Sequence, residues 1–338
     1  MSDNVELRLD HLHVHFPVDR SLTDMVLRRP RHVVRAVDDV SLSVRPNEVL
    51  GLVGETGCGK STIAKTILRM HPVTSGTIQH RGEDVLDFRG SRLREYYAHV
   101  QMVWQDAHSC LNPRMRVREI LARPLICFRD MPRAEIDARV RDVMRVVGLN
   151  DVERDRYPHE FSGGGRQRIV IARALVSEPS FIIADEPTSS LDVSIQAQIL
   201  NLLKRLQASY SLTMLYISHN LSTVSFISTR VAVMYFGRIV EVLNTRDLLR
   251  RNYHWYTRRL MDAVPKGTPL RSVEVGLEAE SRLDYDGCIY RYRCENAKER
   301  CRTERPMLRD LEDGHAVACH FPVEDRPGPG VARPNSDR

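Results

Sequence analysis

A glycine-rich loop between a strand and a helix is the feature that most constrains how this chain folds. The loop, Gly54–Thr62, fits the pattern G-x-x-x-x-G-K-[ST] and follows the apolar run Val49–Val53, which predicts a buried parallel strand. Apolar residues then recur with helical spacing in Ile63–Leu68. Backbone N–H groups in such a loop and the dipole of the following helix attract phosphate oxygens. The sequence therefore predicts a nucleoside triphosphate site at this turn.

Individual residues of the loop have separate expected roles. Glycines let the backbone approach the phosphates closely, Lys60 is expected to reach the β- and γ-phosphates, and the Ser61 hydroxyl is expected to ligate Mg²⁺. A chance glycine-rich turn is the alternative, which the flanking strand and helix disfavour. The nucleotide-binding residues predicted from the loop are Gly54, Gly57, Gly59, Lys60, Ser61 and Thr62.

Two acidic residues at the end of another apolar run form the next candidate site. Phe181–Ala184 predicts a strand, and Asp185 and Glu186 follow it, at the edge where α/β sheets bind ligands. Asp185 is suited to hold the Mg²⁺ shell. Glu186 is placed to orient and polarise a water that attacks the γ-phosphate, because phosphoryl transfer depends on positioning and charge neutralisation. Such a pair alone is more often the solvated start of a loop, but its position after a phosphate loop favours catalysis.

A second anion-binding pattern lies in Phe161–Arg168. Ser162 precedes the successive glycines 163–165, and a helix is expected from about Arg166. Serine is a favoured helix N-cap, and the N–H groups at a helix start bind anions. Because the chain has one phosphate loop but two such sites, the second is expected to close over the nucleotide of another subunit. A flexible hinge is the alternative.

The order of apolar patterns predicts an α/β fold. Val5–Leu9 and Val40–Val44 alternate with period two, as strands do, and Gly76–His80 resumes strand character. Residues 107–160 have helical periodicity, with Gly148 as a C-terminal stop of a helix. Further along, strands and helices alternate, which predicts a parallel sheet with right-handed crossovers. An arginine-rich insertion at about 18–35 has no assignment.

Composition limits where the chain is expected to work. No apolar run approaches the ~20 residues that span a bilayer, and the N-terminus lacks the basic and apolar regions of a signal peptide. Any membrane role is therefore expected to be peripheral. The net charge of +6 is spread along the chain and argues for neither nucleic acid nor anionic lipid as a partner. Seven cysteines without a secretory signal indicate reduced thiols or metal ligands.

Six motifs in family order make the chain similar to the ATP-binding subunit of an ABC transporter. They are the Walker A loop Gly54–Thr62, the Q-loop residue Gln105, the LSGGQ-like signature Phe161–Gly165, the Walker B strand Phe181–Glu186, the D-loop Ser189–Asp192 and the switch histidine His219. The resemblance covers residues 5–262. It implies ATP and Mg²⁺ as cofactors and an ATPase whose hydrolysis is coupled to solute translocation.

The resemblance also implies roles residue by residue. Gln105 would sense the metal and the permease, and it joins Ser61 and Asp185 as a Mg²⁺ residue. His219 would contact the γ-phosphate, and with Gln105 and Glu186 it completes the expected catalytic set. The remaining nucleotide contacts implied are Ser162, Gly163 and Gly164 on the partner's ATP, Asp192 between the two sites, and Phe16 stacked on the adenine.

Further segments resemble the oligopeptide/dipeptide (peptide/nickel) importer subfamily, namely Leu111–Met115, Tyr157–Phe161 and the cysteine-bearing tail. In that subfamily two ATP-binding subunits, identical or different, dock beneath two membrane permeases, and an extracytoplasmic protein delivers the substrate. The chain is thus expected at the cytoplasmic face of the cell membrane, with no nucleic acid partner. Peptide is the default substrate, although nickel, glutathione and sugar importers share these cassettes.

For the fold, the resemblance implies a P-loop NTPase (RecA-like) α/β core with an N-terminal antiparallel β subdomain and an inserted helical subdomain. The nucleotide-binding domain is expected over residues 1–262, with the helical subdomain at about 107–176. A small irregular extension that contains cysteines is expected at 263–325, and a disordered tail at 326–338.

Three positions depart from the family pattern. Gly165 replaces the usual glutamine of the signature, Asn220 the aspartate after the switch histidine, and Thr56 the serine in the Walker loop. Loss of the glutamine side chain is expected to weaken the grip on the partner's nucleotide without loss of function. A catalytically weaker regulatory subunit of a heterodimeric importer therefore stays open. A soluble ABC ATPase of translation or DNA repair is disfavoured, because those usually carry tandem cassettes or long coiled-coil insertions.

The tail carries a second candidate chemistry. Cys288, Cys294, Cys301 and Cys319 follow the spacing C-x5-C-x6-C-x17-C in a basic segment with few large apolar residues. A metal would offset the ~1–2 kcal/mol per residue of backbone ordering entropy, and four thiolates suit a [4Fe–4S] cluster or zinc. The C-x2-C pairs of common zinc sites are absent, and the tail resembles family members thought to carry an iron–sulfur cluster. The cluster is preferred over zinc or free thiols.

Overall fold

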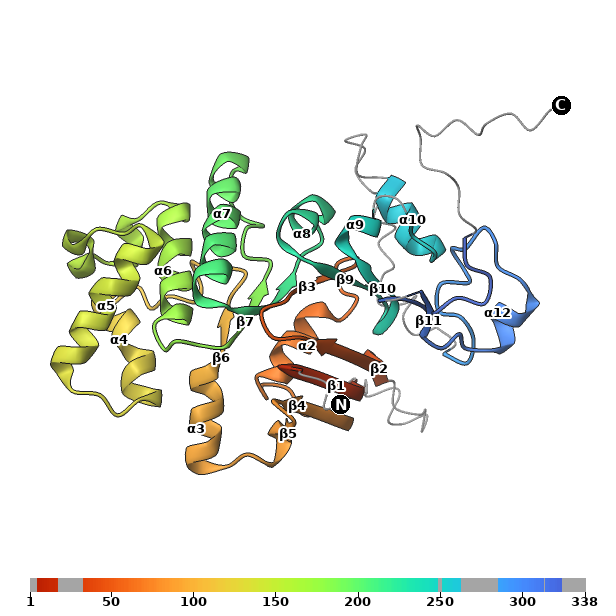
Figure 1. Cartoon of the computed structure of the whole chain (residues 1–338), viewed down its shortest axis with the longest axis horizontal. Coiled ribbons are helices and arrows are strands. Elements are labelled where there is room, and N and C mark those ends of the chain that lie inside the picture. The colour runs from red at the N-terminus through yellow and green to blue at the C-terminus, as the bar shows by residue number, and fades with distance from the viewer. Residues whose placement is uncertain (1–4, 18–32, 249–250, 263–284, 313, 324–338) are drawn as a thin grey trace, which may run out of the picture.

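The computed structural model shows two sheets flanked by a helical lobe on one side and the C-terminal region on the other (Figure 1). It describes residues 5–17, 33–248, 251–262, 285–312 and 314–323. Most of the arginine-rich insertion and the predicted disordered tail at 326–338 lie outside these residues. In the part of the chain so described, no helix has both the length and the apolar character needed to cross a membrane.

The N-terminal strands form an antiparallel sheet in the order β2-β1-β4-β5. They are β1 (Leu7–Pro17), β2 (Val33–Val44), β4 (Ser75–His80) and β5 (Glu83–Asp84). Buried and exposed residues alternate along much of β1 and β2, because one face of this sheet packs on the core and the other meets solvent. The predicted N-terminal antiparallel subdomain is confirmed.

A larger sheet crosses the middle of the molecule, in the order β11-β12-β10-β9-β3-β8-β7-β6. Its parallel strands are β3 (Val49–Val53), β6 (Val100–Val103), β7 (Phe181–Asp185), β8 (Thr213–Ile217) and β9 (Arg230–Tyr235). β3, β7 and β8 are buried along their whole length, which explains why their sequences are continuous apolar runs and do not alternate. The predicted parallel sheet is confirmed.

Helices follow the parallel strands along the chain. Beside the sheet lie α2 (Lys60–Ile67), α3 (Gly90–His99), α7 (Val193–Tyr210) and α8 (Leu221–Ile227). Between β6 and β7 the chain forms a helical lobe of α4 (Val117–Phe128), α5 (Arg133–Val147) and α6 (Gly163–Leu175) (Figure 1). Short 3₁₀ turns complete this part at Val85–Asp87, Asp151–Asp155 and Pro158–Glu160. Helix α5 ends at Gly148, as the sequence predicts, where a φ of 80° favours glycine.

Helix α6 begins earlier than the sequence predicted. The expected start was about Arg166, but α6 begins at Gly163 with Ser162 as its N-cap. The Ser162 hydroxyl accepts a hydrogen bond from the Gly165 N–H at 3.3 Å, which satisfies a donor that has no partner inside the helix. The glycines therefore lie in the first helical turn and do not form a loop before it.

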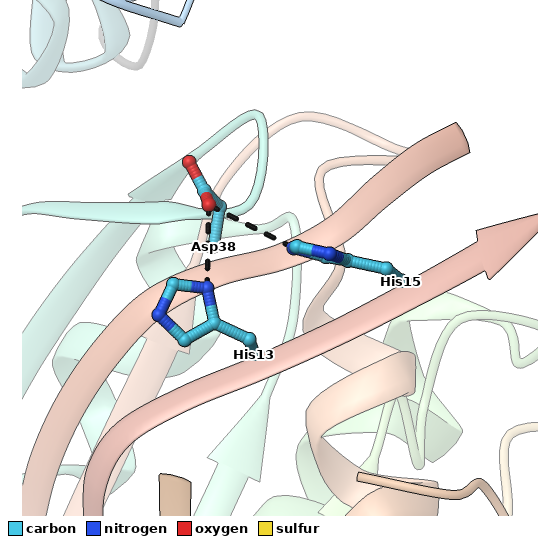
Figure 2. A group of neighbouring side chains, drawn as sticks. All are labelled: His13, His15 and Asp38. Atoms are coloured by element: carbon cyan, nitrogen blue, oxygen red, sulfur yellow. Dashed lines mark ion pairs between the residues drawn. The ribbon is translucent and has the colours of Figure 1, made fainter. Parts of the chain in front are cut away.

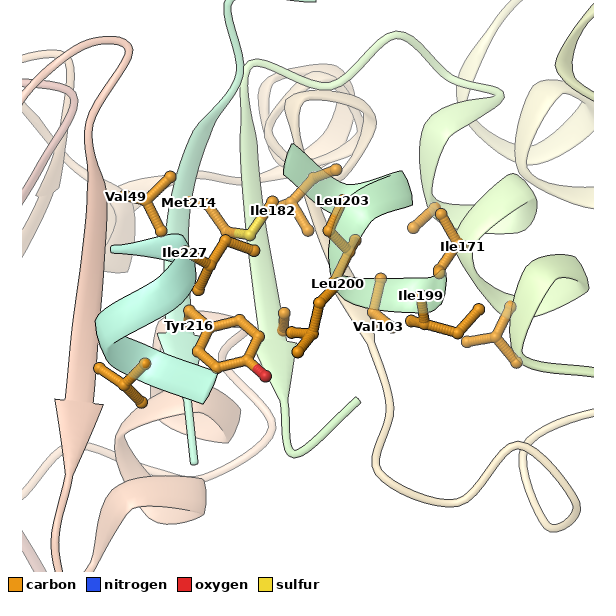
Figure 3. Packing of buried hydrophobic residues seen from close by; sticks show 14 of the residues in the cluster. Val49, Val103, Ile171, Ile182, Ile199, Leu200, Leu203, Met214, Tyr216 and Ile227 are labelled. Atoms are coloured by element: carbon orange, nitrogen blue, oxygen red, sulfur yellow. The ribbon is translucent and has the colours of Figure 1, made fainter. Parts of the chain in front are cut away.

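The buried apolar side chains form two clusters on opposite faces of the central sheet. Along β3, Val49 and Val53 belong to one cluster, whereas Leu50 and Leu52 belong to the other, as the alternation of side chains along a strand requires. Figure 3 shows the first cluster, in which side chains of the strands, such as Met214, face those of the helices. The strand ends that carry the candidate site are held in place by this packing.

The C-terminal region is largely irregular, as expected, but it also contains short regular elements. Its strands β11 (Arg309–Glu312) and β12 (His315–Val317) join the central sheet, where β12 pairs with β10 (Arg238–Asn244). Ile289 and Tyr290 belong to the same buried cluster as the parallel strands. Strands of three or four residues are too short to leave a periodic signal, so sequence reasoning missed them. The remaining helices are α9 (Thr245–Leu248), α10 (Trp255–Asp262) and α12 (Glu299–Thr303).

A buried carboxylate fastens the C-terminal region to the sheet. Glu241 of β10 is 0% exposed, and it accepts hydrogen bonds from His315 Nε2 at 2.7 Å and from the backbone N–H of Tyr253 at 2.6 Å. A buried carboxylate is tolerated only when donors surround it. The extension and the nucleotide-binding part therefore share both a core and a polar anchor, although a domain boundary near residue 262 stays a prediction.

Candidate active site

The phosphate loop connects β3 to α2, as the sequence predicts. Gly59 is the N-cap of α2 with a φ of 107°, and a Cβ at this position would lie 2.1 Å from the carbonyl oxygen of Ala36. Gly57 also has a positive φ, of 84°. Only glycine adopts these conformations at low cost. The glycines therefore let the loop turn tightly at a helix start, where N–H groups lack intrahelical partners.

Lys60 is buried and reaches back across the loop. Its ammonium donates hydrogen bonds to the carbonyl oxygens of Gly54 at 2.9 Å and Glu55 at 2.8 Å. None of its hydrogen bonds within the described chain goes to a carboxylate. A buried cation with neutral partners alone favours an anionic ligand beside it.

Ser61 and Asp185 come together from α2 and β7. The Ser61 hydroxyl donates to Asp185 Oδ1 at 3.2 Å. Burial raises the pKa of Asp185, the Ser61 hydrogen bond opposes this, and the neighbouring Glu186 carboxylate reinforces it. A divalent cation would compensate these two acidic groups, and Mg²⁺ binds through few protein oxygens together with phosphate oxygens. The Ser61 and Asp185 oxygens therefore suit the predicted Mg²⁺ site. Gln105, the third predicted Mg²⁺ residue, is linked to this site by its hydrogen bond to Glu186.

Glu186 lies between Gln105 and His219. Its carboxylate accepts a hydrogen bond from Gln105 Nε2 at 3.0 Å and lies 2.9 Å from His219 Nδ1. These residues follow β6, β7 and β8, which are parallel neighbours, so their C-terminal ends meet at one edge of the sheet. Glu186 also has a φ of 44°, a conformation that costs a non-glycine residue energy and recurs at functional sites. The arrangement is suited to orient a water molecule.

The second anion-binding pattern lies away from the phosphate loop of its own chain. Helix α6 packs on α4 and α5 in the helical lobe and on α7 beside the central sheet, whereas α2 lies beside the N-terminal sheet (Figure 1). Ser162 and Gly163 are exposed, while Gly164 is buried against α7, where a Cβ would lie 2.7 Å from Ile195 Cγ2. The exposed start of α6 is therefore available to a ligand that belongs to another subunit.

The structure shows the contacts around Asn220 and Gly165, two of the residues that depart from the family pattern. Asn220 is the N-cap of α8, where its side chain accepts hydrogen bonds from the N–H groups of Ser222 at 2.9 Å and Thr223 at 3.4 Å. The neutral residue thus provides the cap that an aspartate would provide. At Gly165 a Cβ would lie 3.1 Å from the Phe161 ring, so a larger side chain here requires the ring to shift.

Asp192 and Phe16, the two remaining predicted nucleotide residues, lie on different elements of the fold. Asp192 is the exposed N-cap residue of α7, and in the described chain its carboxylate makes no capping hydrogen bond. Phe16 is partly buried on β1, with its ring 5.1 Å from the His71 ring in an edge-on arrangement. It pairs with Val34, two residues before Ala36, which touches Gly59. The adenine-stacking role of Phe16 stays a prediction.

Sequence reasoning missed one set of contacts, between the phosphate loop and the C-terminal region. Arg293 Nη1 donates to Glu55 Oε2 at 2.8 Å, and the Glu55 N–H donates to Tyr256 Oη at 3.0 Å. Arg293 lies 238 positions from Glu55, and nothing in a sequence that is rich in arginine singles it out. Only the fold brings these groups together.

The four tail cysteines line one small pocket together with His254 and Phe321. Burial raises the pKa of Cys288 and Cys294, and it raises the pKa of Cys319 to about 12. No three of the sulfur atoms lie within 4.8 Å of one another in the described residues. Tetrahedral zinc, with Zn–S near 2.3 Å, needs sulfurs about 3.8 Å apart. The thiols share a pocket but are spaced more widely than a zinc site requires.

A further group of potential metal ligands lies outside the site. His13 Nδ1 and His15 Nε2 approach Asp38 Oδ1 at 3.4 Å and 3.8 Å (Figure 2). Asp38 is buried, however, and its other oxygen pairs with the guanidinium of Arg238 at 2.6 Å. Arg305 and Arg35 add positive charge and, with Arg238, help to lower the pKa of Asp38 against the effect of burial. This positive field disfavours a divalent cation, so the group is a charge network of the fold.

Comparisons with known proteins agree with the geometry. The chain matches the family "ABC transporter" over residues 37–189 and the family "Oligopeptide/dipeptide transporter, C-terminal region" over residues 240–301. It is 44% identical over 324 residues to the probable peptide ABC transporter ATP-binding protein y4tS of Sinorhizobium fredii, covering 95% of this chain and 90% of that protein. It is 41% identical over 315 residues to the oligopeptide transport ATP-binding protein OppF of Bacillus subtilis, covering 93% and 95%.

Solved structures share the fold. The dimeric ATP-binding cassette MJ0796 bound to ADP and phosphate aligns with a TM-score of 0.61 at 24% identity, over 71% of this chain and 99% of that chain. The protein cbiO1 of Clostridium perfringens, part of an ABC transporter complex, aligns with a TM-score of 0.62 at 22% identity, over 83% and 98%. At these identities the likeness shows the fold alone, and it confirms the predicted P-loop NTPase core.

Proposed function

Because the chain belongs to the ATP-binding proteins of ABC transporters, in the oligopeptide/dipeptide group, we propose that it hydrolyses ATP to power the import of oligopeptides or dipeptides. The observation that carries the proposal is the meeting of Lys60, Asp185 and Glu186 at one edge of the parallel sheet. Peptide as the substrate rests on the relatives, whose names describe peptide and oligopeptide transport.

In the proposed mechanism, ATP binds with its β- and γ-phosphates beside Lys60 and the N-terminal turn of α2. Ser61 and Asp185 would hold Mg²⁺, which would supply positive charge to the phosphate oxygens when bound. Glu186 orients and polarises the attacking water, while Gln105 and His219 hold the Glu186 carboxylate in place from both sides. These residues act mainly by positioning, which is the larger part of catalysis in phosphoryl transfer.

A second ATP-binding subunit completes each site in this proposal. Ser162 and Gly163 are exposed at the start of α6, and they would contact the nucleotide held by the partner. Asp192 would link the two sites. Two permease subunits and an extracytoplasmic binding protein complete the importer, and the chain works peripherally at the cytoplasmic face of the cell membrane.

A regulatory subunit of a heterodimeric importer is the second candidate. The observation that favours it is Gly165, which lacks the side chain that the signature usually offers to the partner's nucleotide. Against it stands the complete set of Lys60, Glu186 and His219 on this chain's own site. The two candidates differ in whether transport needs Glu186 of this chain.

Peptide uptake tests the proposed function. Cells that lack this chain are expected to lose uptake of labelled di- and oligopeptides, and to regain it with the wild-type chain but not with Glu186→Gln. Uptake of nickel, glutathione and a sugar serves as the parallel control for substrate class. Full restoration by Glu186→Gln would favour the regulatory candidate, and undiminished peptide uptake without the chain would contradict peptide import.

We also propose that Cys288, Cys294, Cys301 and Cys319 bind one [4Fe–4S] cluster that organises the C-terminal region. Their shared pocket supports a common ligand, and a cubane held by four thiolates spans a wider gap than a single zinc ion. Because burial raises the pKa of Cys288, Cys294 and Cys319, a bound metal would have to stabilise their deprotonated forms. The role proposed is structural, as a cross-link between distant points of the region.

Anaerobic purification with iron, sulfide and zinc analysis tests the cluster. About four irons per chain with visible absorption are expected, and they should be lost in Cys319→Ser but kept in Cys127→Ser, which removes an exposed cysteine outside the pocket. One zinc per chain without iron would replace the cluster by a zinc site. No metal, with the Cys-to-Ser variants equally stable, would leave ordinary thiols.

A further inference from the structure

The phosphate loop is held at Glu55 by the C-terminal region. All polar groups of this residue have partners: its N–H donates to Tyr256 Oη, its carbonyl accepts from Lys60 Nζ, and its carboxylate pairs with Arg293. Tyr256 lies on α10 and Arg293 lies in the segment between Cys288 and Cys301. Glu55 thus connects the lysine expected to bind phosphate directly to the C-terminal region.

The pair between Arg293 and Glu55 is shielded from solvent. Their side chains are 16% and 26% exposed, so salt screens this pair less than it screens a surface ion pair. The guanidinium also lies 6.0 Å from the centre of the Tyr235 ring, and Tyr235 packs on Tyr256 and Tyr290 at 4.6 Å and 5.2 Å. Arg293 is therefore fixed on an aromatic cluster shared by the core and the C-terminal region.

Arg293 neutralises the negative charge that Glu55 places in the phosphate loop. A carboxylate within the loop repels the triphosphate that the same loop has to bind. An arginine opposite it cancels that charge while leaving Lys60 free to face the phosphates. Without the arginine, the electrostatic potential at the phosphate site becomes more negative. The resulting loss of binding free energy grows with the negative charge of the nucleotide.

We propose that Arg293 is a positioning residue of the ATP site, which neutralises Glu55 and holds the phosphate loop in its binding conformation. The C-terminal region thereby sets part of the affinity for ATP. This inference rests on the proposed ATP-binding function and on contacts of the chain's own residues, whether or not the cysteine pocket holds a metal.

Equilibrium binding of Mg-ATP, Mg-ADP and AMP to the full chain tests the inference. Arg293→Gln is expected to weaken the binding of ATP about three- to tenfold, that of ADP less and that of AMP least, because the lost positive charge acts on the charge of the phosphates. Arg293→Lys keeps a cation opposite Glu55 and is expected to recover most of the affinity. In the Glu55→Gln background, Arg293→Gln should change ATP affinity by less than about twofold, since no carboxylate remains to be neutralised.

Arg300→Gln is the matched control. Arg300 directly precedes Cys301 as Arg293 precedes Cys294, and its ion pair with Glu304 at 2.6 Å stays within the C-terminal region. This variant is expected to bind ATP like the wild type. Metal content and thermal unfolding, measured on every variant, identify any that lose the fold of the region.

Three results would overturn the inference: Arg293→Gln binding ATP as the wild type does, an equal loss for ATP and AMP, or the same loss in the Glu55→Gln background. Lys60→Ala in the same assay separates this failure from failure of the proposed function. If Lys60→Ala loses ATP while Arg293→Gln does not, the ATP site stands and only the role of Arg293 falls.

Discussion

Glu186 is the single residue on which hydrolysis is expected to depend most. Glu186→Gln should leave ATP binding intact and slow turnover by roughly 10²–10⁴-fold, because it removes the carboxylate that orients water while keeping the shape of the side chain. Turnover is measured in the assembled transporter. Glu95→Gln, which changes an exposed glutamate of α3, is the control and should hydrolyse normally. Turnover within a few-fold of wild type for Glu186→Gln would contradict the catalytic assignment.

Glu6 is a single residue that is expected to make the free energy of unfolding depend on pH. Burial alone would raise its pKa, but the hydrogen bonds from His80 and Arg81, together with the positive charge of Arg81, outweigh burial and lower the pKa from 4.5 to about 2. A carboxylate with a lowered pKa stabilises the folded state above its unfolded pKa and loses that contribution as the pH falls towards the folded one.

Glu6→Gln should therefore lower the free energy of unfolding by about 1–3 kcal/mol near pH 7 and by less near pH 3.5. Urea unfolding of both proteins at the two pH values measures the difference. An equal difference at both would mean that the charge of Glu6 contributes nothing and that only its packing matters.

At the scale of elements, the start of α6 is expected to clamp the ATP of a partner subunit. Ser162→Arg places a bulky cation at this exposed helix start, so it should block ATP-driven dimerisation while the chain still binds ATP. The assay is mass measurement in solution with Mg-ATP, in the Glu186→Gln background that slows hydrolysis. Ser91→Arg, in the first turn of α3, is the matched exposed control. Dimers that persist in Ser162→Arg would rule out the clamp.

The sequence predicts elements well where one physical signal dominates. The apolar runs of β3, β7 and β8 reveal buried parallel strands, and Gly148 reveals a helix end. Periodicity fails where a single contact decides. A local hydrogen bond to the Ser162 hydroxyl starts helix α6 at Gly163, and β12 becomes a strand because it pairs with β10 far away in the sequence. Neither partner is visible from local periodicity.

The same distinction holds within the candidate site. Glu186 could be predicted from its place at the end of an apolar strand, whereas Gln105 and His219 were expected from the family resemblance. All three follow neighbouring parallel strands, which end at the same edge. The pairing of Glu55 with Arg293 could not be predicted, since two ordinary charged residues far apart in the chain carry no pattern. Contacts of this kind depend on how the C-terminal region folds back over the core.

At the scale of the whole molecule, the central sheet joins three candidate sites. Its parallel strands carry the phosphate loop and the acidic edge, the helical lobe carries the second anion-binding pattern, and its antiparallel strands attach the C-terminal region that contains the cysteine pocket. The C-terminal region is therefore built into the same unit as the phosphate loop, since Glu241 and His315 anchor it and Arg293 reaches the loop.

Equilibrium binding of Mg-ATP to the full chain and to its Lys60→Ala variant tests whether the phosphate loop is the ATP site. The wild-type chain is expected to bind Mg-ATP saturably, and Lys60→Ala is expected to lose affinity at least about tenfold, because the variant removes the buried cation expected beside the phosphates. Unchanged affinity in Lys60→Ala, or no ATP binding by the folded wild-type chain, would contradict an ATP site at this loop.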